Sequence, residues 1–251
     1  MCRVTLAVIA TWCLIMPVPS GARDNTMQMR PYGTWSSPLG ARDLVAGSRD
    51  FSELGVDGAT LYFIESRPEE VGRQALMRRR SDGVNEEITG AQFNVRSRVH
   101  EYGGGALSMG AGTIYFTHFN DQSLYRLVPG GMPEALSRDG NRRFADCIED
   151  KWRGRLICVL EDHAVEGEPR NSLVSISSLA ASEPRVIFSE SDFVAALALS
   201  ADGRRVAFLS WKHPNMPWDD VQMQVAELRE DGSLESIATL NRDQREAVLA
   251  P

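Results

Sequence analysis

Positive charge is scarce in this sequence. Lysine and arginine together number 27 against 34 aspartate and glutamate residues, which gives a formal net charge of −7. A protein that binds nucleic acid through a basic face needs a surplus of cationic side chains to neutralise phosphates. The sequence therefore predicts no nucleic-acid partner.

Cysteine is scarce as well, with four residues in a chain of 251, and this excludes a scaffold dense in disulfides. Two of the four lie near the N-terminus, which leaves Cys147 and Cys158, whose spacing is not that of metal ligands. Cys158 lies within the apolar run Leu156–Val159, which favours a buried, inert thiol. A disulfide between the two cysteines is the alternative for an exported protein.

The sequence also has no apolar segment long enough to span a membrane as a helix. The longest one, Val4–Met16, has thirteen residues, and a helix of that length is too short to span a bilayer. It follows Arg3 and precedes Ser20 and Ala22, two small residues placed for cleavage after Ala22. This layout is typical of a secretory signal peptide over residues 1–22.

The N-terminus leaves two locations open. With a cleaved signal, the protein is periplasmic or secreted and has no stable membrane anchor. With a misassigned start codon, translation begins at Met27 or Met29 and the protein is cytoplasmic.

Motifs for metals and phosphates are not found. The four histidines show no paired ligand spacing such as H-x-x-x-H. Glu161-Asp162-His163 and Glu166 carry ligand atoms, but a solvated loop accounts for them. The glycine-rich run Tyr102–Ala106 lacks the Lys-Ser/Thr of a P-loop. We predict no cofactor and no metal.

The sequence does contain an internal repeat. Asp57-Gly58 and Asp202-Gly203 each separate two apolar stretches, a pattern typical of a β-hairpin. Apolar runs that begin at residues 61, 114, 156 and 206 are 53, 42 and 50 residues apart. A period of this size indicates an array of similar units.

Further strand-like runs repeat in phase with the first. One set lies at Ala75–Met77, Leu124–Leu127, Leu173–Ile176 and Val221–Val225, and another at Ile88-Thr89, Leu136-Ser137 and Ile237–Thr239. About four short strands per unit are typical of a β-propeller blade, with a β-sandwich as the competing interpretation. The predicted fold is all-β, a partial β-propeller of about four blades of four-stranded antiparallel sheets.

The repeats divide the chain into four parts. Residues 1–22 are the signal peptide, 23–50 an entry segment, and 51–240 the partial β-propeller. Residues 241–251 form a tail, with a short helix for which Asn241 is the expected N-cap.

Two segments carry specific motifs, Asn94–Gly105 and His213–Asp219. Weaker ones are Pro31–Pro38, Glu65–Glu70, Glu161–His163 and Glu166–Asn171. Together they resemble the N-terminal propeller of prolyl oligopeptidase family serine peptidases, the bacterial dipeptidyl aminopeptidase/acylaminoacyl-peptidase group. The short repeat Leu199–Ser210 is also similar to the propeller of the Tol translocation system.

The resemblance implies a propeller, commonly of seven blades, that gates access to an α/β-hydrolase domain carrying Ser, Asp and His. No G-x-S-x-G nucleophile motif occurs in the sequence, and the nearest segment, Ala106–Gly110, lacks the first glycine. We therefore expect a propeller fragment of a serine exopeptidase that selects peptides by size. It would have no catalytic residues and be inactive alone, with peptides or a hydrolase domain on a separate or missing chain as partners.

Six residues are candidates for substrate or interface binding: Arg98, His100, Glu101, Tyr102, His213 and Trp218. In an intact enzyme, the acid would anchor a substrate amino group and the arginine a carbonyl or carboxylate. The glycines 103–105 would let the backbone approach a ligand or a neighbouring blade, and the proline-braced loop after His213 is of a kind that carries binding residues. The structural alternative is that these side chains join blades or contact the hydrolase domain.

Two other interpretations of the chain stay open. One is a stand-alone exported propeller that acts as a protein-interaction module, similar to the propeller of the Tol system. The other is an open arc of four blades with unpaired strand edges, which would self-associate or never fold stably.

Overall fold

The computed structural model describes residues 29–34, 36–164 and 166–241. The predicted signal peptide and the predicted helix of the tail lie outside the described residues. The chain divides into two compact units, residues 1–41 and 42–251. In the first, the Thr34 amide and hydroxyl both donate to the Pro31 carbonyl in a turn. No helix in the described ranges is long and apolar enough to span a membrane.

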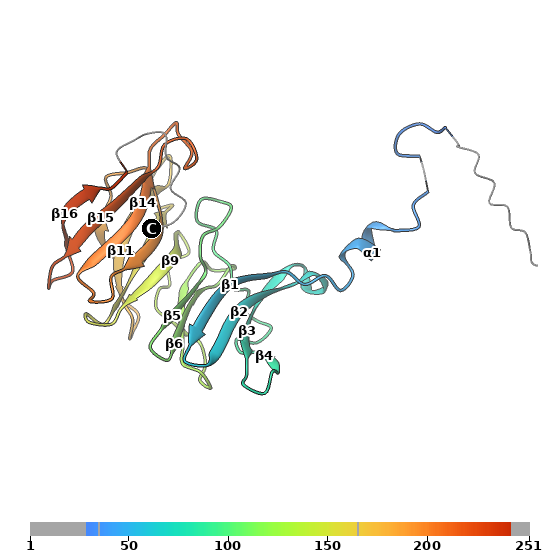
Figure 1. The fold of residues 1–251 in the computed structure, drawn as a ribbon, viewed down its shortest axis with the longest axis horizontal. Helices are drawn as coiled ribbons and strands as arrows, with labels where there is room; N and C mark the ends of the chain where they lie inside the picture. The colour runs from blue at the N-terminus through green and yellow to red at the C-terminus, as the bar shows by residue number, and fades with distance from the viewer. Residues whose placement is uncertain (1–28, 35, 165, 242–251) are drawn as a thin grey trace, which may run out of the picture. The chain divides into compact units, whose positions relative to one another are not determined.

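The second unit is built from four antiparallel sheets, each made of four strands that are consecutive in sequence (Figure 1). A short helix, α1 (Ala41–Val45), precedes them. The first blade contains β1 (Phe51–Asp57), β2 (Thr60–Arg67), the 3-10 turn η1 (Pro68–Glu70), β3 (Arg73–Arg79) and β4 (Asn85–Glu87). The second contains β5 (Leu107–Gly110), β6 (Thr113–Thr117), β7 (Leu124–Leu127) and β8 (Glu134–Ala135). The third contains β9 (Arg142–Asp150), β10 (Arg155–Asp162), β11 (Arg170–Ser177) and β12 (Arg185–Phe188). The fourth contains β13 (Phe193–Leu199), β14 (Arg205–Trp211), β15 (Gln222–Leu228) and β16 (Leu234–Thr239).

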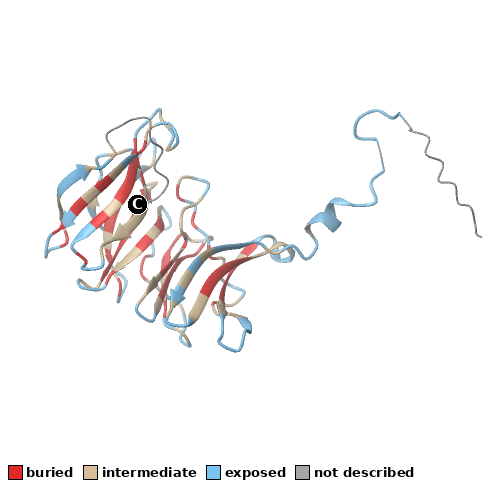
Figure 2. Ribbon diagram, viewed as in Figure 1, coloured by how far each residue is buried: buried red, intermediate tan, exposed pale blue. Residues whose placement is uncertain are grey.

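The blades are adjacent in chain order and meet through their first strands. Strand β5 contacts β1 and β9, and β13 contacts β9. Apolar clusters fill each junction, with Ile64, Leu76 and Phe116 between the first two blades and Val159, Val194 and Phe208 between the last two. The middle strands of the blades are consequently the most buried (Figure 2), because a sheet covered on both faces excludes water from both sets of side chains. The predicted partial β-propeller of four blades is confirmed.

The predicted positions of two outer strands were wrong by a few residues. We placed them at Ile88 and Leu136, whereas β4 and β8 end just before these residues. The amides of Ile88 and Leu136 still donate to Leu76 and Leu124 at 3.0 and 2.7 Å. An outermost strand has only one neighbour to hold it, so its pairing ends earlier than the apolar pattern suggests.

In three of the blades, the first strand contains a bulge. One residue at each bulge has a positive φ: Glu53 in β1, Asp146 in β9 and Ala196 in β13. A bulge turns a side chain out of the regular alternation of the strand. The Glu53 carboxylate uses this to accept the Leu107 amide of the second blade at 2.7 Å. Asp146 accepts the amides of Gly105 at 2.6 Å and Ala196 at 2.8 Å, so one carboxylate joins three successive blades. Burial raises the pKa of Glu53.

Cys147 and Cys158 form a disulfide between β9 and β10, with their Cα atoms 4.1 Å apart. Both side chains are buried in the core between the second and third blades. The prediction of a free, inert thiol at Cys158 was therefore wrong, and the alternative for an exported protein is the one found. The bulge in β9 places Cys147 opposite Cys158, which the spacing of eleven residues does not reveal.

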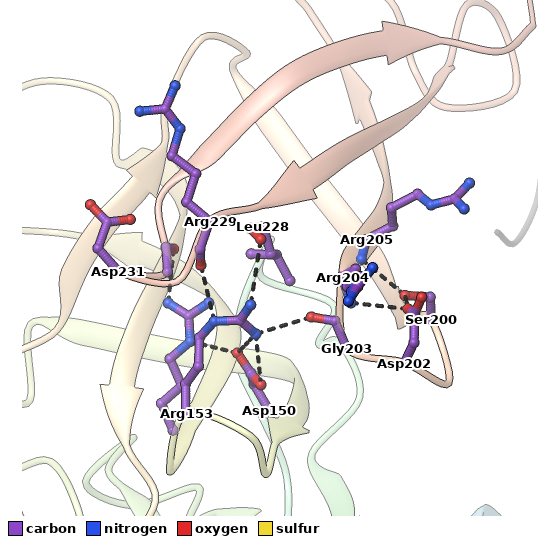
Figure 3. A network of polar contacts seen from close by, with 12 residues as sticks. Asp150, Arg153, Ser200, Asp202, Gly203, Arg204, Arg205, Leu228, Arg229 and Asp231 are labelled. Atoms are coloured by element: carbon purple, nitrogen blue, oxygen red, sulfur yellow. Dashed lines mark hydrogen bonds and ion pairs between the residues drawn. The ribbon is translucent and has the colours of Figure 1, made fainter.

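A buried ionic network joins the third and fourth blades at the end of β9 (Figure 3). The Asp150 carboxylate is fully buried and accepts from Arg153 at 3.0 Å and from Arg155 at 2.9 Å. Arg153 also donates to the carbonyls of Gly203 and Arg229, each at 3.0 Å. Burial lowers the pKa of Arg155. The turn between β9 and β10 is thereby fastened to two turns of the fourth blade.

Candidate functional site

Residues 94–105 connect the first blade to the second, and we call them the crossing segment because they reach the third and fourth blades as well. The Asn94 side chain accepts the Gln74 amide of the first blade at 2.9 Å. The Ser97 hydroxyl donates to the Phe144 carbonyl of β9 at 2.8 Å, and Val99 is buried in the core of the last two blades. The segment therefore places its central residues over the third blade.

The glycines at the end of the crossing segment allow its backbone to approach β9. A Cβ atom at Gly104 would lie 2.7 Å from the Ala145 Cβ, and one at Gly105 would lie 2.7 Å from the Asp146 Oδ1. A side chain at Gly104 would press on β9, and one at Gly105 would displace the Asp146 carboxylate. The glycines were expected to let the backbone approach either a ligand or a neighbouring blade. Gly104 and Gly105 allow the approach to a neighbouring blade.

The tip of the crossing segment has an unusual backbone. His100 and Glu101 have φ angles of +56° and +63°, a left-handed conformation that costs a residue with a side chain about 1–2 kcal/mol. Three hydrogen bonds close the turn, from the Glu101 amide to Arg98, from the Gly103 amide to Val99, and from the His100 amide to the Glu161 carboxylate at 2.7 Å.

Three side chains in a row across the third blade hold this tip. Glu161 of β10 pairs with Arg143 of β9 on one side and with Asn171 of β11 on the other. Arg143 donates to the Arg98 carbonyl at 3.0 Å and to the Glu101 carboxylate at 2.6 Å. The Asn171 Oδ1 atom lies 3.1 Å from the Nε2 atom of His100. We call Arg143, Glu161 and Asn171 the cradle row.

Aromatic rings cover the other side of His100. Phe193 and Trp211 face each other across the β13–β14 pair and stack with their centroids 5.2 Å apart. The imidazole of His100 meets both rings edge-on, at 5.5 and 5.6 Å. His213 meets Phe193 at 4.8 Å. Because burial among these rings disfavours the charged imidazolium, the pKa of His100 is lowered.

A cavity of about 730 Å³ opens beside these groups. Among the lining residues that the structure describes, four are acidic and one is basic. They are Glu101, Glu161, Glu168, Asp192 and Arg170. Phe193, Trp211 and Met216 supply the apolar part of the wall. The wall of the cavity thus combines an excess of carboxylates with aromatic rings.

The six predicted residues separate into two groups. His100, Glu101, Tyr102 and His213 line the cavity. The Arg98 guanidinium instead lies over the Phe119 ring, 5.7 Å from its centroid, and Trp218 is exposed to solvent outside the lining. The sequence prediction missed the cradle row and the pair Phe193 and Trp211, because their meeting depends on strand register.

A possible cation position involves Glu101, Glu161 and His163, whose ligand atoms all lie within 4.8 Å of one another. The Arg143 Nη1 atom contacts both carboxylates, at 2.6 and 3.1 Å. A guanidinium already supplies the positive charge there, and its hydrogen bond is the main reason why the pKa of Glu101 is lowered. We assign no metal to this group.

Four consecutive sheets that meet through their first strands, with a cavity near one end of these strands, define the chain as part of a β-propeller. Two solved structures match it at more than 30% identity over most of its length. The chain is 34% identical to a puromycin hydrolase over 85% of its own length, with a TM-score of 0.73. It is 32% identical to a Mycobacterium tuberculosis puromycin-hydrolyzing peptidase over 90% of its length, with a TM-score of 0.76.

These matches confirm the resemblance to prolyl oligopeptidase family peptidases for the propeller part. The chain spans 35% and 37% of the length of these two relatives. It also matches TolB from Acinetobacter baumannii over 76% of its length and 43% of that chain, at 15% identity and a TM-score of 0.53, which shows the fold alone. No family model and no curated protein matches the sequence.

Proposed function

We propose that this chain is the propeller part of a peptide hydrolase, and that its cavity binds the free amino end of a peptide. The observation that carries this proposal is the lining of the cavity, in which carboxylates outnumber the guanidinium and lie beside an aromatic wall. An ammonium group gains from nearby carboxylates and from aromatic faces. An apolar side chain next to that ammonium would pack against Phe193 and Trp211.

The charge balance favours a free amine over an acylated one. Arg143 neutralises one of the two carboxylates that it contacts, Glu101 and Glu161. Glu168 and Asp192 add negative charge at the wall, beyond what Arg170 offsets. An acylated terminus has no charge to offer and would leave these groups uncompensated. Of the two peptidase types that the sequence suggested, the proposal therefore selects the aminopeptidase type.

The same face would limit the size of substrates. The crossing segment and the loop that follows His213 both contribute to the lining of the cavity, and both connect strands. Rigid blades carrying binding loops are a common way to position such a site. We propose that the propeller gates access in this manner, with peptides and a hydrolase domain as its partners.

We also propose that the protein is exported. The signal-like layout of residues 1–22 supports this, and so does the pairing of Cys147 with Cys158, since disulfides persist in oxidising compartments. A protein-interaction module of the Tol kind is the second candidate, favoured by the shared fold. Such a module would have no need of an acidic cavity that discriminates between amines.

The test is an NMR titration with phenylalanine amide and with N-acetylphenylalanine amide, in which an acetamide replaces the ammonium group. We expect the free amine to shift the His100 and His213 resonances and the acetylated compound to leave them in place. In Glu101→Gln, binding of the free amine should weaken about tenfold. This corresponds to about 1.4 kcal/mol of binding free energy, which is the size of one charge-assisted contact. Glu134→Gln, an exposed carboxylate on β8, is the matched control. Equal binding of both compounds would contradict the proposal.

A further inference from the structure

We propose that Glu161 is the positioning residue of this site. It holds the tip of the crossing segment in the left-handed conformation that brings His100, Glu101 and Tyr102 to the cavity. The effect on binding rests on the proposed function, whereas the effect on the tip does not.

The burial of Glu161 separates it from the other acids of the site. Its side chain is 5% exposed, whereas that of Glu101 is 70% exposed. A buried carboxylate is costly unless donors satisfy it. Glu161 has three, namely the His100 amide on Oε2, and Arg143 at 3.1 Å and His163 at 2.6 Å on Oε1. Both of its oxygens are therefore engaged by the protein, which fits an anchor rather than a ligand-binding group.

The position of Glu161 explains how a central strand can fix a distant loop. Its strand, β10, is buried along almost its whole length and is paired on both sides. Glu161 is the middle member of the cradle row, and each member contacts the tip through a different atom. Arg143 holds a backbone carbonyl and the Glu101 carboxylate, Glu161 the His100 amide, and Asn171 the imidazole.

The strain at the tip shows what the anchor achieves. Two successive residues with side chains in the left-handed region persist only where surrounding contacts over-determine them. Without the bond to Glu161, the His100 amide would be left without its acceptor and the unfavourable φ angles would be free to relax. The Glu101 carboxylate would then leave the cavity wall, and the His100 ring would leave Phe193 and Trp211.

Glu161→Gln tests this with little change in shape. A glutamine can turn its one carbonyl oxygen to the His100 amide only by pointing its NH₂ group at the Arg143 guanidinium, where donor would oppose donor. We expect the His100 Hε1 resonance to lose the shift caused by the Tyr102, Phe193 and Trp211 rings. We also expect phenylalanine amide to bind about tenfold more weakly. The resonance is assigned with His100→Gln. Glu134→Gln, which removes an exposed carboxylate on β8, is the control and should leave the resonance and the binding unchanged.

The outcomes separate positioning from folding and from the proposed function. The His118 resonance, from the second blade, should stay in place in Glu161→Gln and thus report an intact fold. If the variant does not fold, Asn171→Ala removes the neighbouring contact of the same row, and the same loss of ring shift is expected. An unchanged His100 resonance in a folded variant would overturn the proposal. If the wild type fails to bind phenylalanine amide, the proposed function is wrong, while the resonance still decides the role of Glu161.

Discussion

Strand β9 of the third blade carries an ionic cluster at each of its ends, and the two clusters use charge in opposite ways. At the end of β9, one carboxylate, Asp150, serves two arginines whose remaining donors are largely taken by backbone carbonyls. At the other end one arginine, Arg143, serves two carboxylates beside a cavity. Where arginines outnumber carboxylates, backbone carbonyls accept most of the remaining N–H groups, and we call this end the closed joint. Carboxylate in excess leaves acceptors for a ligand.

The largest expected effect breaks the closed joint. Asp150→Asn leaves Arg153 and Arg155 without their carboxylate in a buried place, and removing one partner of a buried pair costs about 3–5 kcal/mol. Urea unfolding should show the loss as a lower midpoint. Glu149→Gln, at the neighbouring position on β9 but bonded to Tyr115 and Ala111 of the second blade, is the comparison and should cost less. Equal losses would mean that the joint is not held by Asp150.

A smaller effect is expected where the crossing segment meets β9. Gly105→Ala places a methyl group 2.7 Å from Asp146, and overpacking of this kind costs about 1–3 kcal/mol. Because Asp146 also holds the fourth blade, the His100 resonance should move as well. Gly140→Ala, where the new methyl group would find its nearest neighbour at 3.7 Å, should unfold at the wild-type urea concentration. A stable Gly105→Ala with an unmoved resonance would show that the close approach is dispensable.

The smallest effect concerns pH at the cavity end. The pKa of His100 lies below its usual 6.5 because the ring is buried, so the unfolded chain binds this proton more tightly than the folded one. The contribution of His100 to stability is therefore complete above about pH 6.5 and is lost as the pH falls from there through the folded pKa. Urea midpoints at pH 7.5 and pH 5.5 should differ less in His100→Gln than in the wild type. The same difference in both proteins would remove His100 as its cause.

Sequence patterns alone predicted the number of blades and the hairpin at Asp202-Gly203, because turn residues and alternating apolar runs are local signals. They also indicated His100, Glu101, Tyr102 and His213, which lie in motif-bearing segments. Arg98 is close to these residues in sequence, but its guanidinium lies over the Phe119 ring, because the left-handed φ angles of His100 and Glu101 turn the chain after it.

The cradle row could not be predicted in this way. Arg143, Glu161 and Asn171 are separated by 18 and 10 positions in sequence, and they meet only because two strand pairs have a particular register. The bulge at Asp146 shifts that register by one residue, and no local pattern in the sequence marks it. The pairing of Phe193 with Trp211 was easier to predict than the cradle row. The two residues lie almost symmetrically about the Asp202-Gly203 turn, so counting outwards from that turn would have placed them near each other.

The crossing segment also sets an order of assembly. Its bonds join residues far apart in the chain, from Ser97 to Phe144 across 47 positions and from His100 to Asn171 across 71. Contacts of such long range form late, because the intervening chain must first be made and closed. During synthesis, the first two blades can emerge and pair while the tip of the crossing segment still lacks its partners on the third blade. The cavity is then completed only when β14 and the loop that follows His213 have left the ribosome, so the part of the molecule proposed to bind a ligand is among the last to be built.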